Sequence, residues 1–297
     1  MTILVGTCSW TGRVPDQTQK FYRTPNPTPE QTLRYYSSVF PTVEVDSTFY
    51  ALPTLQNCQR WAQRTPEDFV FHVKAFSLFT THRTRTKSLP VDVRQSLPAS
   101  IQNKPLLYPG EVPEPLKDEL WSLYREALDP LKQSGKLGLI LLQFAPWFTP
   151  ARQNADYILK CQDNLHGLTV AVEFRHKDWF EGRLLGRTPE WLRENGLAMV
   201  CVDMPQGFDS SIPPLAEATA SESYVRLHGQ NTANWEQQGA TVGNLHDYWY
   251  TEGELAEWLG RIHKLEEDSR RVHVLFNTVQ AVETALLFQD MISRHQE

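Results

Sequence analysis

Charged and polar side chains recur in pairs near the ends of short apolar segments, with one residue between the two members of each pair. The pairs are Glu44 and Asp46, His72 and Lys74, Glu173 and Arg175, and Arg226 and His228. Because side chains alternate between the two faces of a strand, residues i and i+2 point the same way. Three further apolar segments end in Gln143, Asp203 and Asn277. This spacing predicts polar groups that face one shared space.

Carboxylates, imidazoles and amines gathered in one space can perform acid–base catalysis. We predict four catalytic residues, namely Glu173, Lys74, His82 and His228. Glu173 would be the acid/base, with His82 or His228 as its proton partner. The Lys74 amine, desolvated among arginines, would act as a base or nucleophile unless a neighbouring carboxylate keeps it charged. His82 follows its segment in a long loop, where an exposed surface role is the alternative.

The cations indicate an anionic substrate, since guanidinium and ammonium groups bind phosphate and carboxylate. We predict that Arg226, Arg175 and Lys74 hold this anion. The other members of the predicted substrate-binding set are Glu44, Asp46, Gln143, Asp203, Asn277 and Trp179. Trp179 comes just after a strand and would either stack on a substrate ring or pack under the rim. Ion pairs that only brace the fold, such as Glu44 with Arg175 or Glu173 with Arg226, are the structural alternative.

A metal site is less well supported. Suitable oxygen and nitrogen donors occur at Glu44, Asp46, Glu173, Asp203 and His228. No His-x-x-x-His or Glu-x-x-His spacing accompanies them, and the neighbouring cations disfavour a cluster of metal ions. We therefore predict no metal ligands, and the sequence identifies no cofactor.

Eight short segments rich in β-branched and aromatic residues must position these groups. They are Leu4–Ser9, Val43–Phe49, Phe69–Ala75, Gly138–Phe144, Thr169–Arg175, Leu197–Asp203, Tyr224–His228 and Val272–Asn277. Most precede a helical pattern, and eight strand–helix units favour an α/β fold of the (β/α)8 TIM-barrel type in one domain, residues 1–297. An open doubly wound sheet is the alternative, but no Gly-x-Gly-x-x-Gly follows the first strand.

Capping residues and unit lengths refine this prediction. Helices are expected to begin at Thr28-Pro29, Thr149-Pro150, Thr188-Pro189 and Thr251, and one more follows Thr54. The units after strands 3 and 7 are enlarged, by residues 80–115 and 229–250, on the side where barrels carry active sites. The sixth unit, after Asp203, shows no convincing helix.

Composition limits the class of partner. The 297 residues include 29 Lys and Arg against 35 Asp and Glu, a net charge of −6, which does not favour nucleic acid as a partner. The four cysteines are widely spaced, which is typical of reduced thiols and predicts a cytoplasmic protein. Neither a signal peptide nor a membrane-spanning apolar run is recognisable.

Six ordered motifs resemble the YecE-like family, a domain of unknown function with a TIM-barrel fold. They are VGTCSWTG at Val5, VEVDSTFYALP at Val43, FHVKAFSLFTTH at Phe71, LGLILLQFAPWF at Leu137, VEFRHKDWF at Val172 and YVRLHG at Tyr224. The resemblance spans about Thr2 to Phe288. It implies a polar signature at Glu44, Lys74, Thr81, His82, Gln143, Glu173, Arg175, Trp179, Arg226, His228, Gly229 and Asn277.

Three features depart from the family pattern. Asp46 stands where the family usually has Asn, the run after Asn277 differs, and the loop 229–250 is larger than expected. The leading hypothesis is an acid/base hydrolase or isomerase that acts on a small phosphate- or carboxylate-bearing substrate at the barrel mouth. The alternatives are a metal-dependent phosphodiesterase or DNA-repair-type nuclease, and a non-catalytic anion or nucleotide sensor.

Overall fold

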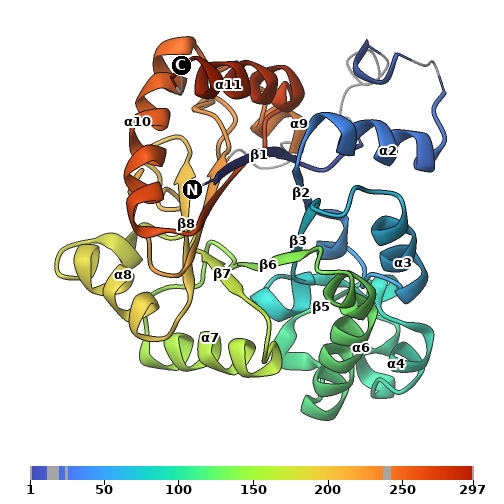
Figure 1. Cartoon of the computed structure of the whole chain (residues 1–297). Helices are drawn as coiled ribbons and strands as arrows, with labels where there is room; N and C mark the ends of the chain where they lie inside the picture. The colour runs from blue at the N-terminus through green and yellow to red at the C-terminus, as the bar shows by residue number, and fades with distance from the viewer. Residues whose placement is uncertain (1, 12–19, 24–25, 237–241, 296–297) are drawn as a thin grey trace.

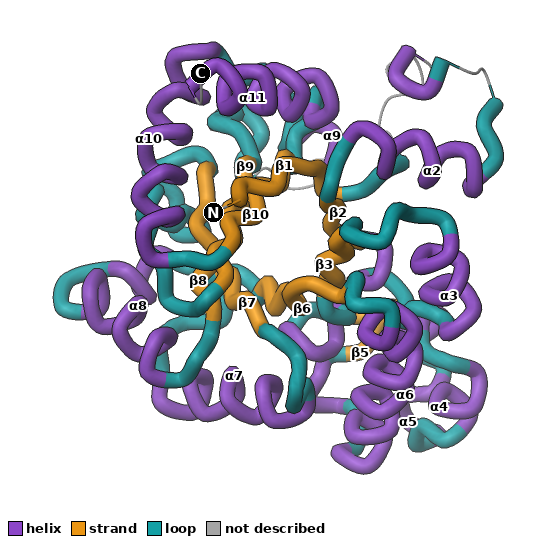
Figure 2. Tube along the Cα trace, viewed as in Figure 1, coloured by secondary structure: helices purple, strands orange, loops and turns teal. Residues whose placement is uncertain are grey.

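A closed ring of eight parallel strands forms the centre of the computed structural model, which describes residues 2–11, 20–23, 26–236 and 242–295. Figure 2 shows the ring with helices around its outside. The strands are β1 (Thr2–Cys8), β2 (Thr42–Val45), β3 (Val70–Lys74), β6 (Leu137–Gln143), β7 (Val170–Glu173), β8 (Ala198–Asp203), β9 (Glu222–Leu227) and β10 (Arg271–Phe276). Each strand pairs with its sequence neighbour within the ring, and β10 closes it against β1. The predicted TIM barrel is confirmed.

The outer layer consists of helices that follow the strands (Figure 1). The long ones are α2 (Pro29–Val39), α3 (Leu55–Gln63), α6 (Glu114–Gln133), α7 (Arg152–Asn164), α8 (Leu184–Glu194), α10 (Glu252–Asp268) and α11 (Ala281–His295). Thr28 and Thr251 form the capping boxes expected of them, and the Thr54 side chain accepts a hydrogen bond from Asn57 N. Residues 204–221, all of them described, contain no helix, as the sequence predicted.

Two helix starts differ from the prediction. Helix α8 begins at Leu184, so Thr188 and Pro189 lie inside it. Thr188 is buried, and its hydroxyl donates to the carbonyl of Trp179 rather than capping a helix. Helix α7 begins at Arg152, two residues after Pro150. Thr188 resembled a cap because its burial is not visible in the sequence, whereas Thr149 is only partly buried and lies three residues before the helix.

The enlarged unit after β3 folds over the outside of the barrel. It contains a two-stranded antiparallel sheet of β4 (Thr84–Arg85) and β5 (Leu106–Leu107) and the short helices α4 (Val91–Gln95) and α5 (Ala99–Gln102). Short 3-10 turns follow three of the barrel strands: η1 (Ser47–Phe49), η2 (Ser77–Thr80) and η5 (Lys177–Phe180). The predicted second strand was too long, because β2 ends at Val45 and η1 follows it.

The lower part of the barrel interior contains a buried histidine pair. The rings of His72 and His273 lie 4.3 Å apart between centroids, and both side chains are fully buried. His72 Nδ1 accepts a hydrogen bond from Leu139 N at 3.0 Å, and His273 Nε2 lies 3.0 Å from a Glu222 carboxylate oxygen. His72 lies in the middle of β3 and does not line the cavity at the carboxyl ends of the strands, so it has a structural role away from the barrel mouth.

Close packing at β1 yields a first prediction. A Cβ added to Gly6 would lie 2.1 Å from the carbonyl oxygen of Thr42 on β2, a backbone atom that cannot rotate away. We expect Gly6→Ala to lower the free energy of unfolding by about 2 kcal/mol or more, measured by urea denaturation. Gly260→Ala is the matched control, since this exposed helical glycine has nothing within 4 Å, and it should stabilise by about 0.5–1 kcal/mol. Equal stabilities would contradict the packing.

Buried histidines yield a second prediction. Burial lowers the pKa of His273, and burial and the neighbouring His273 hold the pKa of His72 well below 6.5. Below about pH 6.5 the unfolded chain therefore binds protons that the folded protein does not. The free energy of unfolding then decreases as the pH is lowered, by up to about 1.4 kcal/mol per pH unit for each such histidine. Urea unfolding between pH 7.5 and 5.5 should show a shallower slope for His273→Gln. The exposed His166→Gln should keep the wild-type slope; a His273→Gln slope equal to it would refute this explanation.

Candidate functional site

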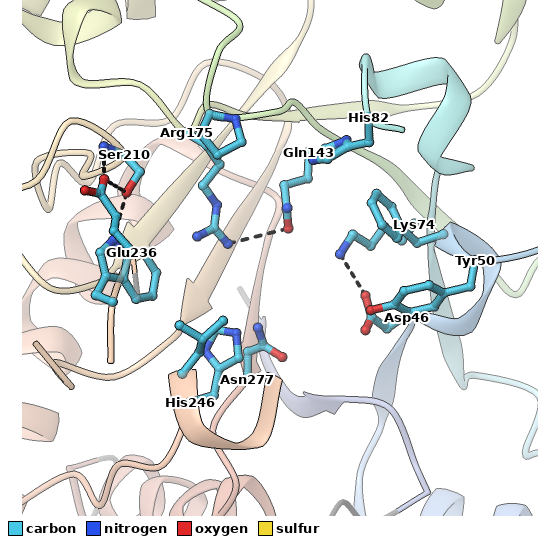
Figure 3. Close-up of a pocket in the computed structure, with 14 residues that line it drawn as sticks. Asp46, Tyr50, Lys74, His82, Gln143, Arg175, Ser210, Glu236, His246 and Asn277 are labelled. Carbon is cyan, nitrogen blue, oxygen red and sulfur yellow. Dashed lines mark hydrogen bonds and ion pairs between the residues drawn. The ribbon is translucent and has the colours of Figure 1, made fainter. Parts of the chain in front are cut away.

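A cavity of about 640 Å³ opens at the carboxyl ends of the barrel strands. Figure 3 shows the residues that surround it, from several strand ends and the loops beyond them. The lining residues are Asp46, Phe49, Tyr50, Lys74, His82, Gln143, Pro146, Arg175, Ser210, Trp235, Glu236, Leu245, His246 and Asn277. Six of the predicted site residues are among them, namely Asp46, Lys74, His82, Gln143, Arg175 and Asn277.

Lys74 forms one side of the cavity. Its ammonium group lies 2.9 Å from Asp46 Oδ1 and 4.5 Å from the centroid of the Phe49 ring (Figure 3). The backbone carbonyl of Lys74 accepts hydrogen bonds from Thr48 Oγ1 at 2.6 Å and Tyr124 Oη at 3.3 Å, which fixes the end of β3. The sequence analysis could not say whether a carboxylate lies beside Lys74; in the structure, Asp46 is that carboxylate.

Arg175 forms the opposite side. Its Nε donates to Glu173 Oε1 at 2.6 Å, and its Nη2 lies 3.1 Å from His228 Nε2 and 3.5 Å from Gln143 Oε1. The guanidinium lies 5.7 Å from the centroid of the Trp235 ring. Nη1 makes no hydrogen bond with any described residue, so this end of the guanidinium keeps donors for a ligand.

Below the cavity lies a layer of buried charges centred on Arg226. Its Nη1 donates to Glu173 Oε2 at 2.5 Å and to Gln143 Oε1 at 3.0 Å, and its Nη2 donates to Glu44 Oε1 at 2.7 Å. Tyr224 Oη donates to the other Glu44 oxygen at 2.7 Å. Arg226 is 1% exposed and both carboxylates are 0% exposed, so these three groups lie beneath the cavity and do not line it.

Glu173 is unsuited to the predicted acid/base role. Burial opposes its ionisation, but the guanidiniums of Arg175 and Arg226 outweigh burial and hold its pKa well below the usual range. Both of its oxygens are bonded to arginines. A carboxylate that holds no proton near pH 7 and does not reach the cavity braces the site instead of transferring protons.

His228 has a similar bracing position. It is fully buried, its Nδ1 lies 2.9 Å from Asn277 Nδ2, and its Nε2 lies beside Arg175. Burial, together with the charge of Arg175, holds its pKa well below 6.5, so the ring is neutral. It orients Arg175 and Asn277 from behind, and a direct proton transfer to a ligand in the cavity does not fit this position.

His82 is the predicted catalytic histidine that reaches the cavity. Its Nδ1 lies 3.0 Å from Thr80 Oγ1, which leaves Nε2 for a ligand, and its ring packs edge-on against Phe49. Burial, with the charges of Lys74 and Arg175, lowers its pKa to about 3. Thr81, just before it, has a φ of 66°, and this left-handed turn lets His82 N bond to Ser77 O at 3.1 Å. The loop histidine is therefore part of the mouth.

Two residues predicted to bind substrate lie elsewhere. Asp203 is buried under the loop after β9, where it accepts hydrogen bonds from Gln230 Nε2 and Tyr250 Oη, each at 2.5 Å. Burial raises its pKa. Trp179 is 5% exposed, stacks on Phe174 at 4.3 Å between centroids, and donates to Phe148 O at 2.7 Å. Neither side chain lines the cavity, because packing and loop anchoring occupy them.

The loops contribute residues that sequence reasoning missed. Trp235, Glu236, Leu245 and His246 come from the enlarged loop after β9. Trp235 Nε1 donates to Ser210 Oγ at 2.9 Å, and the hydroxyl of Ser210 donates to Glu236 at 2.6 Å. Strand periodicity cannot select loop residues, although the length of the insertion had indicated where to look.

Among the residues with described positions, no group of three or more His, Cys, Asp or Glu side chains is arranged to hold a metal ion. Within the same residues, no helix is both long and apolar enough to span a membrane.

The fold and cavity define the class: a TIM-barrel protein with a polar, charged site at the carboxyl ends of its strands. The model of the family described as "Protein of unknown function DUF72" matches residues 4–297, so the chain belongs to this family. The predicted resemblance to a TIM-barrel family of unknown function is confirmed at that level.

Individual relatives agree. The chain is 30% identical over 239 residues to the UPF0759 protein YunF of Bacillus subtilis (strain 168), covering 78% of this chain and 75% of that protein. Crystal structures of DUF72 family proteins from Enterococcus faecalis V583 and Thermotoga maritima MSB8 match with TM-scores of 0.78 and 0.76. The identities are 23% and 26%, and coverage is 98% and 99% of this chain and 96% and 100% of theirs.

The buried charges yield a third prediction. Arg226→Met removes the cation that Glu44 and Glu173 share in a fully buried site, so we expect a loss of about 3–5 kcal/mol in the free energy of unfolding. Tyr224→Phe removes one hydrogen bond to Glu44 and should cost about 1–2 kcal/mol. Arg226→Lys keeps the positive charge, so its loss of stability should lie between the losses of Arg226→Met and Tyr224→Phe. Urea denaturation measures all three, and an unchanged stability for Arg226→Met would refute the bracing role.

Proposed function

We propose that the protein is an acid–base enzyme that binds a small substrate by its phosphate or carboxylate group in the cavity at the barrel mouth. The observation that supports this most directly is the presence of two cations, Lys74 and Arg175, beside a neutral histidine, His82, in one cavity. The resemblance to YecE-like proteins, drawn from the sequence motifs, is compatible with this proposal but names no activity.

The anion would bind between the two sides of the cavity. Arg175 keeps Nη1 available, while Glu173 and His228 hold the rest of its guanidinium in place. Such a preorganised guanidinium donates charge-assisted hydrogen bonds without further ordering cost. Lys74 offers a second cation, and Gln143 and Asn277 add neutral polar groups to the lining.

His82 would move the proton. In the empty cavity its pKa of about 3 reflects burial and repulsion by Lys74 and Arg175. An anion bound between those cations would offset their repulsion and raise the pKa of His82 toward the range in which imidazole is an effective base and acid. Substrate binding would thus bring His82 into its working pKa range. In a hydrolysis, His82 would take a proton from the attacking water and return it to the leaving group as that bond breaks; in an isomerisation, it would move a proton between two atoms of the substrate.

A non-catalytic anion sensor is the second candidate. It is favoured by the ionised, buried state of Glu173, which leaves His82 as the one predicted acid–base residue besides Lys74 that lines the cavity. The metal-dependent phosphodiesterase or nuclease has less support, because Glu44 and Glu173 already bind guanidinium groups. A small anion therefore remains the proposed partner, ahead of nucleic acid.

The fourth prediction tests binding and turnover separately. A thermal-shift screen of small phosphates and carboxylates, each paired with its uncharged alcohol or amide, should raise Tm for charged members only. Lys74→Gln should weaken binding of a hit at least about tenfold, because it removes one cation. His82→Gln should keep binding within a few-fold but lower turnover about 10²–10⁴-fold, measured by NMR of the substrate.

His166→Gln is the matched control, because this histidine is exposed and lies outside the cavity. It should change neither binding nor turnover. A hit that binds through Lys74 but is recovered unaltered would establish the sensor instead. Charged and uncharged members that stabilise equally would overturn anion recognition altogether.

A further inference from the structure

A second cavity of about 290 Å³ lies on the outside of the barrel, between α7 and α8. The two helices are neighbours in the outer layer (Figure 1). Two tryptophans, Trp179 and Trp191, and three arginines, Arg152, Arg183 and Arg187, line this cavity. We refer to it as the α7–α8 groove. None of its lining residues lines the cavity at the mouth.

Positive charge in the groove is not balanced locally. No acidic side chain is among the lining residues. Arg187 forms ion pairs with Glu190 at 2.8 Å and Glu194 at 3.8 Å. Arg152 and Arg183 form no ion pair with any residue the structure describes. Both arginines are exposed and line the groove, so their guanidiniums are available to an anion with two negative charges.

The floor of the groove favours a flat, apolar group. Trp179 is 5% exposed, stacks on Phe174 and donates its indole N–H to Phe148 O, so only a small, rigidly held part of its surface faces the groove. Trp191 is half-buried and contributes aromatic surface from α8. Aromatic rings bind preferentially to such surfaces by stacking or edge contacts. The volume is close to the lower end of small-molecule sites, roughly 300–1,000 Å³, which limits the occupant to a small ring system.

From these observations we propose that the α7–α8 groove is a second ligand site, which binds a small aromatic ring carrying a phosphate group. The ring contacts Trp191 and the small exposed part of Trp179, and the phosphate dianion is bound by Arg152 and Arg183. The sequence left open whether Trp179 stacks on a ring or packs under the rim; in the structure it packs against Phe174, and the part of it that remains accessible lines this groove. This site does not depend on the function proposed for the mouth.

Phenyl phosphate is the probe that tests the groove. Titration calorimetry at pH 8 with the full-length protein should detect its binding, with inorganic phosphate at least tenfold weaker because it leaves the floor unfilled. Benzyl alcohol should not bind detectably, because it has no charge. Equal affinities for phenyl phosphate and inorganic phosphate would overturn the proposed ligand class, and so would the absence of any phenyl phosphate binding.

Variants locate the binding. The double variant Arg152→Gln/Arg183→Gln should bind phenyl phosphate at least tenfold more weakly. Trp191→Ala should weaken binding of phenyl phosphate several-fold and leave the affinity for inorganic phosphate unchanged. Arg85→Gln/Lys87→Gln removes the same charge from an exposed site elsewhere and should have no effect. Lys74→Gln, at the mouth, should leave unchanged the component of phenyl phosphate binding that the groove variants remove. If Lys74→Gln abolishes binding and the groove variants do not, phenyl phosphate binds at the mouth and the groove proposal is wrong.

Discussion

One buried guanidinium organises the interior of this barrel. Arg226, on β9, bridges Glu44 on β2 and Glu173 on β7, so three strands separated around the ring meet in one charged layer. A single charge buried here would be destabilising by several kcal/mol, and each member is tolerated only because the others neutralise it. Burial disfavours the charged form of Arg226, yet both carboxylates together raise its pKa well above the usual range. Because the same contacts also lower the pKa of Glu173, Arg226 and Glu173 both keep their charges near neutral pH.

The charge balance of this layer determines what the cavity above it can bind. Glu44 and Glu173 contribute two negative charges, Arg226 and Arg175 contribute two positive charges, and His228 is neutral. Arg175 is the member that extends into the cavity, with one end on Glu173 and the other end open. On the opposite side, the ammonium group of Lys74 donates one of its three N–H bonds to Asp46. Both Arg175 and Lys74 therefore keep positively charged hydrogen-bond donors, and these suit an anionic ligand.

Strand periodicity predicted which residues face the interior but not how deep they lie. In three doublets the first residue (Glu44, His72 or Glu173) is fully buried, and the second (Asp46, Lys74 or Arg175) lines the cavity. Alternation has a period of two residues and carries no information on height along the barrel axis, which depends on strand tilt and stagger. The fourth doublet breaks the pattern, since Arg226 and His228 are both buried. The barrel was predictable because eight apolar segments repeat, whereas Trp235 and His246 come from a loop with no periodicity.

Anchoring explains how that loop can still form a defined wall of the site. Asp203, at the end of β8, accepts from Gln230 and from Tyr250, near the two ends of the connection between β9 and α10. Tyr250 Oη also accepts from Gly229 N at 2.8 Å, and Gly229 has the φ of 84° that glycine tolerates. His246 Nδ1 lies 3.3 Å from the His228 carbonyl, which adds a third attachment. A buried carboxylate that never reaches the cavity thus positions the tryptophan that covers Arg175, so Asp203 shapes the site through the loop instead of through a ligand.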